Sequence, residues 1–112
     1  MDEKEKILTD NFNEYFQLGL RVLSEKKYNS ATTLFFKAIV ALSDLFIFKK
    51  ESRIPSSHTD RFRTIQDKYS ELYKILDRDF PFYQDSYTKK MDRESAELLK
   101  DDIGKIKKML DK

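Results

Sequence analysis

The sequence predicts an all-α protein, an up-and-down antiparallel bundle of four to five helices. Three observations lead to this prediction. Glycine and proline each occur only twice in 112 residues, so little in the chain interrupts helices. Apolar residues recur at spacings of three and four, the period of one helix face. The breaks between these stretches are short, and short connections place successive long helices side by side and antiparallel.

Composition bounds the class of protein. A chain of this length is expected to form a single domain, residues 1–112, with a core supplied by 39% hydrophobic and 13% aromatic residues. The net charge of +2 argues against a uniformly basic nucleic-acid-binding surface, although a local basic patch is compatible with it. Without cysteine and with one histidine, we expect no disulfide, no closed metal site and no cofactor.

The beginning of the chain and its apolar segments bear on localisation. The polar N-terminal residues lack a signal sequence, and no run of about 18 apolar residues exists. We therefore expect a cytoplasmic protein with no membrane partner.

The first two helices are predicted over residues 3–25 and 30–49. Gly19 lies in the apolar stripe of the first, where it allows a close approach of another helix. Asn29 or Ser30 is available to cap the second. The second helix is apolar on most sides, so we expect it at the centre of the bundle or between the core and a second subunit. Lys37 on this helix is interpreted as a surface residue whose stem lies along apolar neighbours.

The stretch Glu51–His58 separates the second helix from the third. Pro55 lacks an N–H and disfavours helix at the preceding residue, so the chain must break here. Ser56 or Ser57 can cap a third helix over residues 58–77.

Pro81 marks the next predicted break. The segment Asp79-Phe-Pro81 is expected to end the third helix, and a short aromatic segment over residues 82–91 follows. Asp92 then caps a last helix over residues 93–110. Gly104 falls inside this helix, where it should cost about 1 kcal/mol relative to alanine.

His58 and Arg53 are the candidate catalytic residues. The only histidine lies at the predicted start of a helix, where the helix dipole favours the neutral imidazole, which can act as a base. Arg53 precedes it across the proline turn, near enough for both side chains to reach one point. A guanidinium beside an imidazole suits a phosphodiester substrate. The alternative is a capping or partly buried histidine and a solvated arginine.

Charged residues around this loop form a candidate nucleic-acid-binding cluster, whose alternative is a solvated helix end. Its members are Lys49, Lys50, Arg61 and Arg63. Nearby aromatic residues recur at core spacing and are interpreted as packing residues. The acidic pairs Asp101-Asp102 and Asp77/Asp79 are interpreted as surface and capping charges and not as an acid–base dyad.

The stretch 28–45, followed by Arg53-Ile-Pro-Ser-Ser-His58, resembles the HEPN superfamily of small helical bundles. Members often carry an Arg-x4–6-His motif at this position, and many are metal-independent endoribonucleases whose two subunits line one cleft. The resemblance thus implies a homodimer in which Arg53 and His58 act on RNA, leaving a 2′,3′-cyclic phosphate. Catalytic members commonly have a polar residue after the arginine, where this chain has Ile54.

Three readings remain open. The first is a HEPN-like endoribonuclease or RNA-binding protein. The second is a non-catalytic nucleotide-binding or protein-interaction module, toxin–antitoxin-like or a scaffold, for which a nucleotidyltransferase-type protein is a candidate partner. The third is a helix-hairpin adaptor, because part of the first two helices matches tetratricopeptide spacing, although no second repeat follows. The matching residues are Gly19, Tyr28, Ala31, Phe35 and Ala38.

Overall fold

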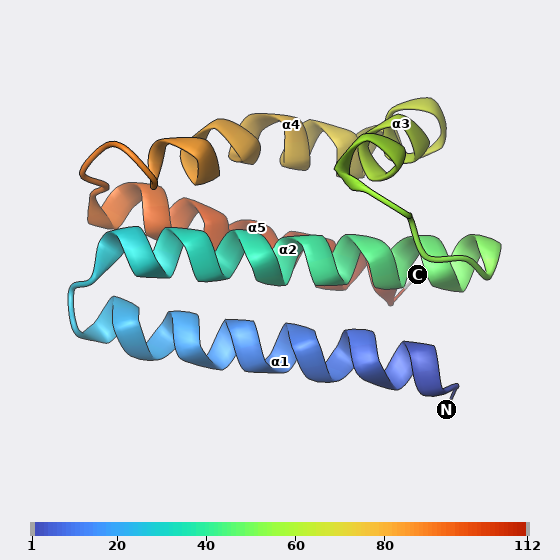
Figure 1. Cartoon of the computed structure of the whole chain (residues 1–112), viewed down its shortest axis with the longest axis horizontal. Helices are drawn as coiled ribbons and strands as arrows, with labels where there is room; N and C mark the ends of the chain where they lie inside the picture. The colour runs from blue at the N-terminus through green and yellow to red at the C-terminus, as the bar shows by residue number, and fades with distance from the viewer. Residues whose placement is uncertain (1, 112) are drawn as a thin grey trace.

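Five α-helices make up most of residues 2–111, the part of the chain that the computed structural model describes. They are α1 (Glu3–Ser24), α2 (Tyr28–Glu51), α3 (His58–Lys68), α4 (Ser70–Asp85) and α5 (Arg93–Leu110). The four long helices run along one axis, with α2 in the middle, and α3 crosses at one end (Figure 1). The predicted all-α bundle is confirmed.

The core is built around α2, which packs against α1, α4 and α5. Phe35, Ile39 and Ile47 on this helix are completely buried. Burying a side chain of this kind stabilises the fold by about 2 kcal/mol. Because apolar residues occupy most sides of α2, the helix can bury one face against each neighbour, and this explains its central position.

The same apolar character bears on membrane spanning. Within residues 2–111, α2 is the one helix that could cross a membrane by length and composition. It contains no unbroken apolar run of that length, so this possibility was missed from the sequence and rests on the high average hydropathy of the helix. In the bundle, 72% of its most apolar stretch is buried. Burial of this kind is also what the core helix of a soluble protein shows.

The two glycines play different structural roles. A Cβ at Gly19 would lie 2.6 Å from the Phe35 ring, so α1 and α2 approach as closely as the sequence predicts. A Cβ at Gly104 would meet nothing within 4 Å. Packing therefore requires the first glycine and not the second.

The connection between α1 and α2 differs from the prediction. The second helix begins at Tyr28, and no side chain caps it. Asn29 instead donates its amide hydrogens to the carbonyls of Ser86 and Lys89, and its oxygen accepts from the Met91 N–H. The predicted cap is wrong because this side chain holds the connection between α4 and α5.

The predicted third helix is in fact two helices. Ser57 caps α3 as expected, with its hydroxyl accepting from the Asp60 N–H at 3.1 Å. The chain then breaks at Tyr69, which is half-buried, packs edge-on against the Phe46 ring and donates its hydroxyl to Glu51. The backbone at this residue is non-helical, with φ −132° and ψ 72°, and these contacts with α2 hold the side chain in that position.

The predicted break at Pro81 is also wrong, because α4 continues through it to Asp85. Pro81 has no N–H, so the carbonyl of Asp77 loses the hydrogen bond that it would otherwise accept within the helix. Both residues lie on the exposed side of α4, where water can satisfy that carbonyl. Phe80 and Tyr83 pack against Phe36 of α2 with ring centroids 5.8 and 4.8 Å away. These aromatic contacts favour the continued helix. The last helix begins after its Asp92 cap, as predicted.

Two acidic residues expected at the surface lie in the core. Asp79 of α4 and Asp102 of α5 are both 0% exposed, and Arg78 donates hydrogen bonds to both carboxylates. Burial, followed by the hydrogen bond and the negative charge of Asp102, raises the pKa of Asp79 to about 8. The Asp79 carboxyl is therefore mostly protonated in the folded protein at neutral pH. The interpretation of Asp79 and Asp102 as surface charges is wrong.

Candidate functional site

His58 occupies the first position of α3, where the Ser57 cap and the buried Pro55 position it. Its exposed ring lines two neighbouring hollows in the surface. The cationic hollow, of about 280 Å³, is lined by Tyr15, Phe36, Lys37, Val40, His58, Arg61 and Tyr83. The aromatic hollow, of about 530 Å³, is lined by His58, Thr59, Phe62, Arg63, Gln66, Asp77 and Phe80.

Hydrogen bonds from His58 through Arg61 to Asp44 hold the imidazole in place. Arg61, one helical turn later, donates from Nη1 to the Nδ1 of His58 at 2.9 Å. The same guanidinium donates Nε and Nη2 to the two carboxylate oxygens of Asp44 on α2, at 2.6 and 2.9 Å. Arg61 is 9% exposed and Asp44 7%, so this two-pronged ion pair is largely shielded from water. It orients the imidazole rigidly.

The contact with Arg61 decides the protonation of His58. A guanidinium only donates hydrogen bonds, so Nδ1 must accept and the neutral ring carries its proton on Nε2. Burial and the charges of Arg61 and Lys37 lower the pKa of His58, against the opposing charge of Asp44. The lowered pKa has the predicted direction. In this tautomer, however, Nε2 is a donor and not a base.

Lys37 completes the cationic hollow. It is exposed on α2, and its charge is close enough to contribute to the lowered pKa of His58. Sequence reasoning assigned Lys37 only to the surface and did not single out Asp44. Their separation of seven residues puts both on one face of α2, and that spacing is the signal that could have linked them.

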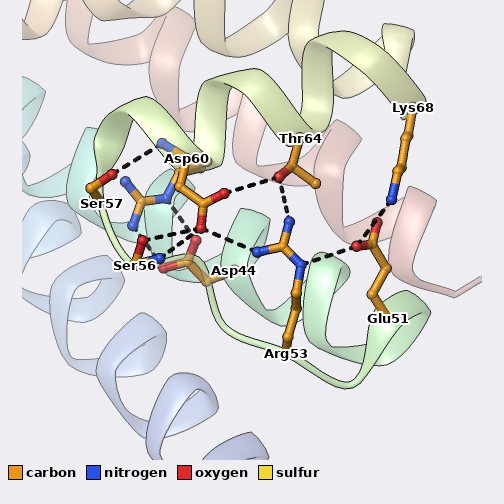
Figure 2. A network of polar contacts seen from close by, with 9 residues as sticks. Asp44, Glu51, Arg53, Ser56, Ser57, Asp60, Thr64 and Lys68 are labelled. Atoms are coloured by element: carbon orange, nitrogen blue, oxygen red, sulfur yellow. Dashed lines mark hydrogen bonds and ion pairs between the residues drawn. The ribbon is translucent and has the colours of Figure 1, made fainter.

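Arg53 binds other residues. It donates to Glu51 at 3.2 Å, to Asp60 at 3.1 Å and to the hydroxyl of Thr64 (Figure 2). Two carboxylates thus compensate its charge, and His58 is not among its hydrogen-bond partners. The guanidinium that contacts His58 is that of Arg61.

The partners of Arg53 are themselves held in place. The Asp60 carboxylate accepts from the Ser56 N–H at 2.9 Å, and this contact is the main reason that the pKa of Asp60 is lowered. Glu51 accepts from the Tyr69 hydroxyl at 2.7 Å and pairs with Lys68 at 3.4 Å. In this arrangement Arg53 clamps the connection between α2 and α3.

The predicted basic cluster divides into two parts. Arg61 contacts His58, and Arg63 lines the aromatic hollow. Lys49 pairs with Glu5 of α1 at 3.5 Å, and Lys50 lies over the Phe46 ring. Neither lysine lines a hollow that contains His58. The structure therefore places the two arginines, and not the two lysines, at the candidate site.

No group of three or more metal-ligating side chains gathers within residues 2–111. Comparison of the chain with models of protein families, with curated proteins and with solved structures finds no match.

Proposed function

We propose that this chain is a HEPN-like RNA-binding protein that holds a phosphate group of single-stranded RNA in the cationic hollow. One observation carries the proposal: Arg61 occupies Nδ1 of His58, so the exposed ring has an Nε2–H to donate beside two cations. A phosphate oxygen is an acceptor with negative charge and matches a donor placed among cations.

The charges of the hollow support this assignment. Lys37 and Arg61 bring two positive charges, Asp44 removes one, and the lowered pKa of His58 keeps its ring uncharged near neutral pH. The remaining single charge suits one phosphate of a polyanion better than a free dianion. The backbone of RNA supplies such singly charged groups in series.

Cleavage of RNA is the alternative that the same site must be tested for. A base at His58 would need a free lone pair on Nε2 and an acceptor facing Nδ1, as in catalytic histidines oriented by a carboxylate. Arg61 faces Nδ1 instead, and the charge of Arg53 is already compensated by Glu51 and Asp60. This geometry supports binding more than proton transfer.

The experiment measures the affinity for a fluorescently labelled single-stranded RNA by anisotropy, with EDTA present, over a series of salt concentrations. We expect Lys37→Ala to weaken binding about tenfold and to reduce the salt slope by about 0.7, the loss of one phosphate contact on a single strand. His58→Ala should weaken binding to a similar extent. Lys108→Ala removes the same charge from the exposed side of α5, away from both hollows, and is the matched control.

Two outcomes overturn the proposal. Equal effects of Lys37→Ala and Lys108→Ala would place RNA binding elsewhere or make it nonspecific. Metal-independent cleavage that His58→Ala and Arg53→Ala both abolish would show that the endoribonuclease reading is correct. On the binding proposal, Arg53→Ala retains RNA affinity within about threefold of the wild type, because its partners are Glu51, Asp60 and Thr64.

A further inference from the structure

The aromatic hollow lies beside the proposed phosphate site, between α3 and α4. Three rings form its walls: the centroid of His58 lies 6.3 Å from that of Phe62 and 5.9 Å from that of Phe80, and the two phenylalanine centroids are 5.5 Å apart. Both phenylalanine side chains are only half-buried, so part of their ring surface faces the hollow. Its volume of about 530 Å³ is within the range of small-molecule sites, which is roughly 300–1,000 Å³.

Polar groups stand at the edge of this apolar surface. Asp77 comes from α4, and Gln66 and Arg63 come from α3, so they flank the hollow from its two sides. All three are exposed, and among residues 2–111 no salt bridge engages the Asp77 carboxylate. A carboxylate that lines an aromatic hollow without an ionic partner can accept hydrogen bonds from a ligand.

We propose that the aromatic hollow is a nucleobase subsite that prefers guanine. The inference rests on the proposed function, because His58 lines both hollows and so places this one next to the phosphate. A nucleotide whose phosphate accepts from His58 in the cationic hollow can therefore put its own base against Phe62 and Phe80. Stacking on aromatic side chains is favourable for every base and does not choose among them.

The preference for guanine comes from Asp77. Guanine presents two adjacent donors on its Watson–Crick edge, N1–H and the N2 amino group, and the two oxygens of one carboxylate can accept both. Adenine and cytosine each present a ring-nitrogen acceptor at the corresponding position, and uracil flanks its single N–H with two carbonyl oxygens. A carboxylate repels these acceptors, so Asp77 both attracts guanine and disfavours the other three bases.

The test is calorimetric titration of the protein with the four ribonucleoside monophosphates (GMP, AMP, CMP and UMP), each as its methyl ester, so that the phosphate carries a single charge as it does in RNA. We expect GMP to bind at least about tenfold more tightly than AMP, CMP or UMP, the discrimination of one good bidentate base contact. Asp77→Asn should remove the preference for GMP and leave weak binding of all four. Phe80→Leu should weaken all four together, because it removes stacking and not the base-edge contact.

Controls separate this inference from the proposed function. Asp101→Asn removes an exposed carboxylate from α5 and should bind GMP as the wild type does. Asp77 is exposed, so its substitution leaves the core intact, and an unchanged melting temperature confirms this for each variant. Equal binding of the four nucleotides, binding of none, or a GMP preference that survives Asp77→Asn overturns the guanine subsite. If the guanine subsite is overturned but Lys37→Ala still weakens RNA binding, the proposed function stands without the guanine subsite.

Discussion

Replacing Asp79 by asparagine should stabilise the protein, and increasingly so as the pH rises. In the folded state Asp79 and Asp102 are both completely buried, and the pKa of Asp79 is raised to about 8 from its ordinary 3.8. A carboxyl whose pKa is raised by folding binds more protons in the folded protein than in the unfolded chain. Stability therefore falls as the pH rises from about 4 toward 8. Asparagine needs no proton to donate a hydrogen bond to Asp102.

The pKa difference sets the size of the effect. One pKa unit corresponds to about 1.4 kcal/mol. Over the roughly three pH units between 3.8 and neutral pH, the free energy of unfolding of the wild-type protein falls by at most about 4 kcal/mol. The asparagine variant does not undergo this loss, because its side chain does not titrate. The amide oxygen of the introduced asparagine can still accept from Arg78, whose Nε lies 3.3 Å from the replaced carboxylate oxygen, so the contacts of the wild type are retained.

The assay is urea denaturation followed by far-UV circular dichroism, between about pH 5 and pH 9. The free energy of unfolding of the Asp79→Asn variant should exceed that of the wild type by a margin that grows with pH and levels off above about pH 8. Asp101→Asn, next to Asp102 but exposed, should track the wild type within about 0.5 kcal/mol. Parallel pH profiles of the wild type and Asp79→Asn would show that folding does not raise the pKa of Asp79.

Two further predictions concern packing and the His58 site. Gly104→Ala should raise the free energy of unfolding by about 1 kcal/mol, because a Cβ there meets nothing within 4 Å. Gly19→Ala should lower it, because its Cβ would meet the Phe35 ring at 2.6 Å. Thermal melts of both variants measure the contrast, and equal shifts in melting temperature would contradict it. Asp44→Asn should destabilise the protein by about 3 kcal/mol, because it leaves Arg61 buried without its counter-charge. The same substitution should lower the pKa of His58 further, because Asp44 is the one charge that raises this pKa. An NMR titration of the imidazole measures this pKa, and a rise would refute the assignment.

Parts of the candidate site could be predicted from the sequence. His58 lies exposed at the start of a capped helix, as its position after Pro55 and Ser57 indicates. Its pKa is lowered in the predicted direction, but the causes are burial and the charge of Arg61, which the sequence position did not reveal. Its guanidinium partner could not be predicted, because Arg53 and Arg61 are both within reach along the chain. The choice depends on Asp44, which lies on another helix and holds Arg61 against the histidine, while Glu51 and Asp60 hold Arg53 away from it.

What the sequence by itself determined is local: which stretches are helical, which faces are apolar, and where caps such as Ser57 and Asp92 begin a helix. These features depend on residues within one or two turns of each other. Tertiary structure alone decided the break at Tyr69, the continuation through Pro81 and the burial of Asp79. Each of these depends on a contact with another helix, and no periodicity along the chain records which side chains from distant segments meet across the core.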